Sequence, residues 1–316
     1  VAKPGDRIDG GFTVVRRLGR GASADALLVR ADDDPDEEEL VLKVALDPAN
    51  NDRLQAEGAA LAKLHHQNVV KVRRTLPVAG RTAVLMEHVN GQTLAQHLRR
   101  EERLSLDLIR RFGEELLSAV DHLEEKGVAH RDIKPDNIGI TEGKERKRLI
   151  LFDFSLTRTS PDNIQAGTRP YLDPFLSLRR PPRWDLNAER FAVAVTLYEM
   201  LTGTVPSWSD EQSDPAAVGA EAVIEADRFD PHLRDGLTGF FTKALRSDAR
   251  ERFDNAEDMQ RAWRHVFDQP ALEKIEDASF DAVARRATAQ TSISELGYGI
   301  EAQDVLDRMG IHTVRD

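Results

Sequence analysis

Eight consecutive residues, from His130 to Asn137, contain side chains that a phosphoryl-transfer reaction requires. Asp132 could accept the proton of an attacking hydroxyl group, and Lys134 could neutralise charge on the phosphoryl group as it moves. Asn137 offers an amide oxygen that could hold a magnesium ion. An acid, a cation and an amide at this spacing predict an enzyme that transfers phosphoryl groups.

A turn with two glycines precedes this stretch in the chain. Gly19 and Gly21 lie between two apolar runs, residues 12–15 and 26–29, that are typical of the strands of a hairpin. Glycine lets backbone N–H groups approach nucleotide phosphates without an intervening side chain. Ala24 stands where a third glycine would complete the pattern, so the turn alone is a weak signal for a nucleotide.

Three charged residues occur at positions that could complete such a site. Lys43 lies in an apolar strand-like run and, taken alone, would be an ordinary lysine whose head group reaches solvent. Glu57, in a helix predicted from Leu54, is its natural partner. Asp153 ends another apolar run and could bind a metal ion. The order of these signals along the chain is more specific than any one of them.

In this order, the motifs resemble those of the eukaryotic-type (Hanks-type) serine/threonine protein kinases, from about residue 8 to residue 268. The resemblance implies an α+β fold of two lobes: an N-terminal lobe at 1–87, with an antiparallel sheet and one helix, and a helical C-terminal lobe at 88–268. ATP and Mg²⁺ would bind between the lobes. Lys134 is similar to the serine/threonine branch, which implies protein hydroxyl groups as substrates and leaves autophosphorylation open.

The resemblance also implies roles for individual residues. The catalytic residues would be Asp132, Lys134, Asn137, Lys43 and Glu57. The metal ligands would be Asn137 and Asp153. Met86 would be the gatekeeper, and the backbone of Glu87 and Val89 would meet the adenine edge. The implied nucleotide pocket consists of Leu18, Gly19, Gly21, Ala24, Ala26, Val41, Lys43, Met86, Glu87, Val89 and Asp153.

Several residues depart from the family pattern. Ser155 replaces the glycine that normally ends the metal-binding triplet, so we expect less backbone flipping there. Residues 173–175 read Asp-Pro-Phe instead of Ala-Pro-Glu, so Arg252 would lack its usual glutamate partner, and the sequence leaves the anchoring of the segment open. Glu189 replaces an aspartate and must still reach the backbone of the catalytic loop.

The segment between residues 156 and 172 could be regulated by phosphorylation. Arg131 resembles the arginine that usually binds a phosphate on this segment. Thr168 is expected near Asp132 and Lys134. For Thr159 and Ser160, formation of a turn before Pro161 explains the hydroxyl side chains equally well. The candidate phosphorylation sites are Thr157, Thr159, Ser160 and Thr168.

Composition excludes several other classes of protein. The 316 residues include no cysteine, and no apolar run is long enough to span a bilayer, so we expect the cytoplasm and no membrane. The net charge of −11 argues against broad binding to nucleic acid. The acidic run at 32–39 is expected to be a solvated hairpin loop.

Two helices of the larger lobe can be predicted from their caps and periodicity. Ser105 is a plausible N-cap for a helix with one apolar stripe, which contains Ile109, Phe112, Leu116, Val120 and Leu123. Asp254, followed by Glu257, is expected to open a second helix. Met259, Trp263 and Phe267 would share the core-facing side of that helix.

The composition changes at Gln269-Pro270, and residues 269–316 are expected to form a separate helical tail. The tail resembles the C-terminal helical repeat of RNA polymerase alpha, which is related to helix-hairpin-helix modules. Residues 271–316 carry nine acidic and five basic side chains, a net charge of −4 that disfavours direct DNA binding. A docking surface or a spacer is the preferred interpretation.

The beginning at Val1 and the end at Asp316 favour a piece of a larger parent chain. Together with the tail, the stretch from Ala188 to Ala192 resembles bacterial kinases of the phage growth limitation type, which act in phage defence. Three functions stay open: an active Mg-ATP-dependent kinase, a catalytically weak ATP-binding pseudokinase scaffold, and a small-molecule phosphotransferase. Lys134 and residues 167–171 resemble protein-substrate machinery and so disfavour the third.

Overall fold

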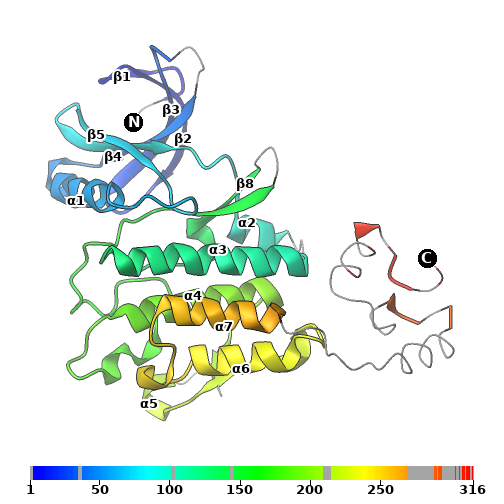
Figure 1. The fold of residues 1–316 in the computed structure, drawn as a ribbon. Coiled ribbons are helices and arrows are strands. Elements are labelled where there is room, and N and C mark those ends of the chain that lie inside the picture. The colour runs from blue at the N-terminus through cyan, green and yellow to red at the C-terminus, as the bar shows by residue number, and fades with distance from the viewer. Residues whose placement is uncertain are drawn as a thin grey trace.

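The structure is a computed structural model. It describes residues 3–34, 38–100, 104–142, 146–208 and 215–268, together with residues 288, 289, 291–293, 303, 306, 308, 309, 311–313 and 315. The N-terminal sheet stands above a layer of helices, and the chain passes between these two parts after β6 (Figure 1).

The upper part is a six-stranded sheet whose neighbouring strands are all antiparallel. Its strand order is β1-β2-β3-β4-β6-β5, with bounds Arg7–Ile8 (β1), Phe12–Arg20 (β2), Ala24–Ala31 (β3), Glu39–Ala45 (β4), Val72–Val78 (β5) and Arg81–Glu87 (β6). Helix α1 (Asn51–Leu61) packs on β6 and β5. A short 3-10 helix, Pro48–Asn50, precedes it.

Alternation along β4 separates the two faces of this sheet. Leu40, Leu42 and Val44 are buried in a core that lies on one face. Because successive side chains of a strand point to opposite faces, Val41 and Lys43 belong to the other face. This face carries the single cation of the strand.

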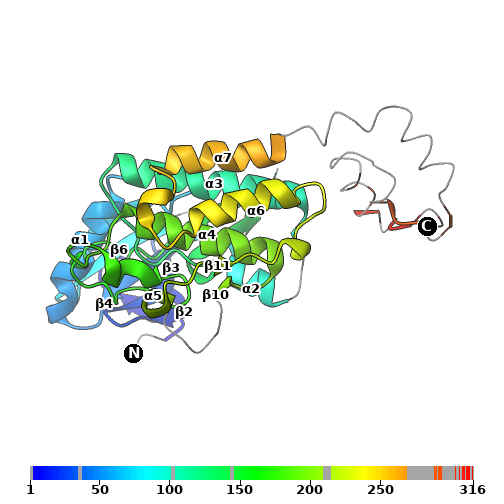
Figure 2. The same cartoon turned by 90° about the horizontal axis from the view of Figure 1, so that it is seen from below.

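The lower part is mainly helical. Its helices are α2 (Leu94–Arg99), α3 (Leu106–Glu125), α4 (Leu186–Thr202), α5 (Pro215–Val218), α6 (Arg234–Ala244) and α7 (Ala256–Asp268). Two small antiparallel sheets accompany them, made of β7 (Gly91–Thr93), β8 (Ile138–Glu142) and β9 (Lys147–Leu151), and of β10 (Ser207–Trp208) and β11 (Ala222–Val223). Four 3-10 helices are Pro135–Asn137, Pro174–Leu178, Ala226–Arg228 and Ala249–Glu251. Seen from below, α3 and α7 lie side by side, and α4 and α6 follow (Figure 2).

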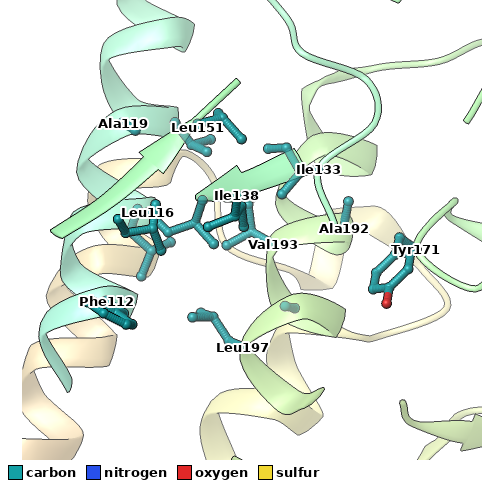
Figure 3. Close-up of a cluster of buried hydrophobic side chains, with 14 of the residues drawn as sticks. Phe112, Leu116, Ala119, Ile133, Ile138, Leu151, Tyr171, Ala192, Val193 and Leu197 are labelled. Atoms are coloured by element: carbon teal, nitrogen blue, oxygen red, sulfur yellow. The ribbon is translucent and has the colours of Figure 1, made fainter. Parts of the chain in front are cut away.

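Helix α4 is buried over most of its length and supports the core beneath the small sheet. Figure 3 shows Phe112 and Leu116 of α3 facing Val193 and Leu197 of α4, with Ile138 between them. All five side chains are fully buried. Burial of each such side chain stabilises the fold by roughly 1.5–3 kcal/mol. The core therefore fixes the start of β8 against two rigid helices.

The predicted N-cap of α3 is confirmed, while that of α7 is wrong by one residue. The Ser105 side chain accepts a hydrogen bond from Leu108 N–H, and the five residues of the predicted stripe are buried. At α7, however, Asn255 rather than Asp254 accepts the N–H of Asp258, at 2.7 Å. Both side chains suit the N-cap, so the sequence left the helix start ambiguous by one position.

Other expectations concern the edges of the described chain. Asp32, Asp33 and Asp34 follow β3 as predicted for a hairpin loop, while residues 35–37 lie outside the described residues. Most of the predicted helical tail, residues 269–316, also lies outside them. Among the residues that are described, no helix is long and apolar enough to cross a membrane.

Gly113 allows α3 and α7 to approach closely. A Cβ atom at this position would lie 2.3 Å from the Trp263 ring, whose Nε1 donates to the Arg110 carbonyl at 3.0 Å. Trp263 is fully buried and is held by this bond, so it has little room to move. The contact explains a glycine in the middle of a helix that would otherwise favour alanine.

We therefore expect Gly113→Ala to destabilise the protein by about 1–3 kcal/mol through overpacking, measured by urea unfolding. Gly239→Ala in α6 is the matched control, since no atom lies within 4 Å of the added Cβ. The control should be neutral or slightly stabilising because alanine favours helix over glycine. Equal stability of the two variants would show that the α3–α7 contact is not tight.

Candidate active site

Three charged side chains from distant parts of the chain meet at Lys43. Its Nζ lies 2.7 Å from Glu57 Oε1 on α1 and 2.7 Å from Asp153 Oδ1 after β9. Burial alone would lower the pKa of Lys43, but the two carboxylates outweigh it and raise this pKa, so the ammonium group stays charged. Burial likewise opposes ionisation of Asp153, but Lys43 lowers the pKa of Asp153 and keeps its carboxylate ionised.

Strand register brings several predicted nucleotide-pocket residues onto one face of the large sheet. Gly19 pairs with Ala26, and Ala26 pairs with Lys43, so these residues form a row across β2, β3 and β4. Val41 pairs with Met86 and shares the face of Lys43, since it lies two residues away on β4. Ala24, two residues from Ala26, belongs to the same face.

The other two residues of the turn lie outside this row. Gly21 N–H donates to the Ala24 carbonyl at 2.9 Å, and this bond closes the turn between β2 and β3. Leu18 sits at an irregularity in the β2–β3 pairing and is 37% exposed. Both residues lie at the hairpin end, beside Gly19.

Beyond Met86, one backbone group of the predicted adenine edge is already bonded within the protein. Glu87 N–H donates to the Lys71 carbonyl at 2.9 Å, so only the carbonyl of Glu87 could meet an adenine edge. Val89 packs closely over Gly139 of β8: a Cβ atom on Gly139 would lie 2.4 Å from Val89 Cγ1 and 3.5 Å from the Phe152 ring. Sequence reasoning missed Gly139 and Phe152, because only the fold brings them to Val89.

The predicted catalytic side chains converge on Asp132. Lys134 Nζ donates to Asp132 Oδ2 at 2.7 Å and to Thr168 Oγ1 at 2.6 Å. Asn137 Nδ2 donates to the Asp132 carbonyl at 2.8 Å and to Oδ2 at 3.1 Å. The other carboxylate oxygen, Asp132 Oδ1, is buried and has no hydrogen-bond partner within the described part of the chain. A buried acceptor without a partner is costly and suits an oxygen that receives a proton from a substrate.

The backbone of this loop is held by two buried side chains. Glu189 of α4 accepts the His130 N–H at 2.5 Å and the Arg131 N–H at 2.9 Å, so glutamate reaches the loop as the sequence requires. His130 Nδ1 accepts the Asp132 N–H at 3.2 Å, and Nε2 lies 2.9 Å from the Phe152 carbonyl. Burial lowers the pKa of His130 and keeps the ring neutral, which fits structural support.

Asn137 and Asp153 fit a magnesium ion held largely by phosphates. The described residues contain no cluster of three or more His, Cys, Asp or Glu side chains that could hold a metal alone. Magnesium usually takes one or two protein oxygens together with phosphate oxygens. Asn137 uses its amide nitrogen on Asp132, which leaves the amide oxygen for a cation, and Asp153 retains a 41% exposed side chain.

Comparison with known proteins identifies the family of this chain. The family described as "Protein kinase domain" matches residues 12–265. The chain belongs to the protein kinase family. The predicted two-lobed α+β fold and the predicted serine/threonine kinase type are thereby confirmed.

Three bacterial relatives illustrate the similarity. The chain is 38% identical over 293 residues to "Probable kinase PglW" of Streptomyces coelicolor, a match that covers 83% of this chain and 19% of that protein. It is 27% identical to "Probable serine/threonine-protein kinase PknB" of Lactococcus lactis, over 78% of this chain and 40% of that protein. It is also 27% identical to "Serine/threonine-protein kinase PrkC" of Bacillus subtilis, over 85% of this chain and 42% of that protein. The chain therefore spans less than half the length of each relative.

Arg252 has no glutamate partner at position 175, as expected, but the segment is still anchored to it. Arg252 Nη1 donates to Asp173 Oδ2 at 2.6 Å, and Nη2 lies 3.3 Å from Oδ1, so Asp173 takes the place of the missing glutamate. Arg179 Nη2 adds a bond to the same carboxylate at 2.8 Å. Phe175, at the glutamate position, is fully buried, and the Arg252 guanidinium lies 6.0 Å from its ring centre. The ion pair has moved two residues along the chain.

Ser155 does not strain the backbone where the family pattern has glycine. The only non-glycine residues with positive φ in the described chain are Ala79, Arg131 and Asp153. The Ser155 carbonyl accepts two bonds from Arg53 of α1, at 3.2 and 3.0 Å. The present conformation needs no glycine at this position, while reduced flipping stays a prediction.

Asp173→Ala should destabilise the protein by about 3–5 kcal/mol, because it leaves Arg252 buried without its partner. The Arg252 side chain is 2% exposed and that of Asp173 is 0% exposed. Urea unfolding would measure the loss. Arg250→Ala is the matched control, since Arg250 forms its ion pair with Asp248 on the surface, and its unfolding midpoint should stay near that of the wild type. Equal midpoints for both variants would contradict the anchor.

Glu189 should make stability depend on pH. Burial raises its pKa from 4.5 to about 7, against the opposing effect of the two N–H donors. Because the folded chain binds this proton more tightly than the unfolded chain, the stabilisation is complete below about pH 4.5 and is lost as pH rises through about 7.

Between pH 5 and pH 8, the unfolding free energy of the wild type should therefore fall by about 2–3 kcal/mol relative to Glu189→Gln, which cannot titrate. Urea unfolding of both proteins across this range measures the difference. Parallel curves for the two proteins would show that the pKa of Glu189 is not raised.

Proposed function

We propose that this chain is an ATP- and Mg²⁺-dependent serine/threonine protein kinase that transfers the γ-phosphoryl group to protein hydroxyl groups. The observation that carries the proposal is the buried, partnerless Asp132 Oδ1 beside Lys134, Asn137 and Thr168, within the described part of the chain. It lies within a fold whose second charged cluster, at Lys43, is also assembled. The two clusters together offer a proton acceptor and a phosphate-binding cation.

In this proposal, ATP supplies the transferable phosphoryl group, and Mg²⁺ neutralises charge on its oxygens. Asp132 accepts the proton of the substrate hydroxyl as the new phosphorus–oxygen bond forms and the bond between the γ-phosphorus and the departing ADP breaks. The Lys134 side chain stabilises negative charge near that oxygen. Lys43, oriented by Glu57, binds phosphate oxygens, while Asn137 and Asp153 would hold the metal ion.

The remaining pocket residues would enclose the nucleotide. The row of Gly19, Ala26 and Lys43 shares one face of the sheet with Val41 and Met86, which supports a pocket on this face. In this proposal the hairpin residues Leu18, Gly21 and Ala24 cover the phosphates. The Glu87 carbonyl and the Val89 backbone orient the base.

We also propose a wider setting for the domain. The similarity to the Streptomyces protein supports the resemblance to phage-growth-limitation kinases and hence a role in phage defence within a larger parent chain. The cytoplasm as compartment, and docking rather than DNA binding by residues 269–316, stay predictions.

Two alternatives differ in chemistry. A catalytically weak pseudokinase would bind ATP through the Lys43 cluster without transfer, and the unusual Ser155 and Phe175 are the residues that suggest it. The replacement of the lost anchor by Asp173 removes one reason for that interpretation. A small-molecule phosphotransferase is disfavoured by the bond between Lys134 and Thr168, which joins the catalytic loop to the segment expected to receive protein substrates.

Asp132→Ala should lower phosphotransfer by about 10²–10⁴-fold, the usual contribution of a general base. Transfer from labelled ATP to a generic protein substrate would measure this. Lys43→Met should also cripple turnover, and should affect turnover more than the fold, because Lys43 binds phosphates in the proposed mechanism.

The matched control is Lys63→Met, since this exposed lysine follows α1 and lies outside both clusters. ATP-induced thermal stabilisation without any transfer by the wild type would favour the pseudokinase. Near-normal transfer by Lys43→Met would contradict the assigned role of that residue.

A further inference from the structure

Neutral groups of the segment at 156–172 bind the Arg131 guanidinium. Its Nη1 donates to the Thr159 carbonyl, and its Nη2 lies 3.5 Å from the Asn163 carbonyl. Both acceptors are backbone groups of the segment that contains the candidate phosphorylation sites. The guanidinium thus joins the catalytic loop to this segment through uncharged acceptors.

The Trp184 ring also lies against the Arg131 guanidinium. The Arg131 Cζ atom lies 4.6 Å from the centre of the Trp184 ring, a cation–π distance. Trp184 is 8% exposed and packs with Leu176 and Ala188, and its backbone N–H donates to the Pro161 carbonyl at 2.7 Å. The ring is therefore fixed both to the segment and to the helical lobe.

A phosphate could reach this arginine only after a rearrangement. Arg131 Nε is buried and has no partner in the described part of the chain, so it is closed to solvent. The exposed Ser160 hydroxyl is instead close to Asp162, at 3.5 Å from Oδ2 and 3.3 Å from the backbone N–H. This geometry matches turn formation rather than delivery of a phosphate to Arg131.

We propose that Trp184, with the Thr159 and Asn163 carbonyls, forms a clamp on Arg131 that positions the catalytic loop for phosphotransfer without phosphorylation of residues 157–160. This proposal rests on the proposed kinase function. Trp184 is a positioning residue, since it acts on Asp132 only through Arg131 and the loop backbone. The clamp supplies neutral acceptors and an aromatic face where a phosphate would supply charge.

The first test removes the hydroxyl groups that could be phosphorylated. The variant Thr157→Ala/Thr159→Ala/Ser160→Ala keeps the backbone carbonyl of position 159 that bonds Arg131. After phosphatase treatment and confirmation of a phosphate-free mass, its initial rate should lie within about twofold of the wild-type rate, with no lag. Two results together would overturn the proposal: an initial rate of the phosphate-free triple variant at least tenfold below that of the untreated wild type, and an equally low rate of the phosphatase-treated wild type that autophosphorylation restores.

The second test removes the clamp itself. Trp184→Ala should lower kcat by about tenfold or more, with KM for ATP changed less than about twofold, because the loop and not the nucleotide pocket is disturbed. Trp184→Phe keeps an aromatic face and should restore most of kcat. Phe267→Ala is the control for loss of an aromatic group from the helical lobe, since it packs on Trp263 away from Arg131. Unchanged kcat in Trp184→Ala, or no rescue by phenylalanine, would overturn the clamp.

A third measurement needs no catalytic activity. Hydrogen exchange of residues 156–168 in the phosphate-free protein should be faster in Trp184→Ala than in Trp184→Phe or the wild type. Equal exchange in all three proteins would disprove the clamp even if the chain transferred no phosphate. Absence of transfer by the wild type, with faster exchange in Trp184→Ala, would overturn the proposed function and leave the clamp standing.

Discussion

The catalytic loop depends on the buried carboxylate of Glu189. Arg131 has a left-handed backbone with φ of 71°, a conformation that costs a non-glycine residue roughly 1–2 kcal/mol. Such a conformation persists only when its surroundings determine it several times over. The two N–H bonds to Glu189 fix the backbone on one side of Arg131, and the guanidinium bonds fix its side chain. This restraint fixes the position of Asp132, and therefore also of the side chains that bond to it.

Asp153 is restrained in a comparable way on the opposite side of the site. Its φ is 62°, and its carboxylate is held by Lys43, which is held in turn by Glu57. A buried ammonium group between two carboxylates has little freedom, since loss of either partner would leave charge unpaired in a site of low polarity. Arg131 and Asp153 both belong to the helical lobe, and the bond between Lys43 and Asp153 connects that lobe to the N-terminal sheet.

A contact of the candidate site could be predicted from the sequence only where both of its residues belong to a motif. Lys43, Glu57, Asp132, Asn137 and Asp153 belong to an ordered pattern, so their meeting could be predicted, although their catalytic roles stay predictions. The fold class followed from the same pattern.

The partners outside a motif could not be found in this way. Asp173 and Arg252 are 79 positions apart, and no local signal shows that a carboxylate two residues before the expected glutamate can reach the same guanidinium. Trp184 likewise lies far from Arg131 in the chain, so only the fold shows their contact. Asn255 replaced Asp254 as the helix cap because both side chains can cap a helix, and only packing of α7 selects one of them.

The two departures around the segment have a common physical logic. At the end of the segment, a carboxylate supplied from a different position satisfies a buried arginine, and Phe175 fills the vacated place with apolar volume. At Arg131, backbone carbonyls and an aromatic ring contact the guanidinium, at a position where the family pattern has an arginine that usually binds a phosphate. In both places the arginine is kept and its partner is exchanged, because an unpaired buried guanidinium would be far more costly than a changed partner. Both arginines are therefore satisfied in this region, although the groups that satisfy them differ from those of the family pattern.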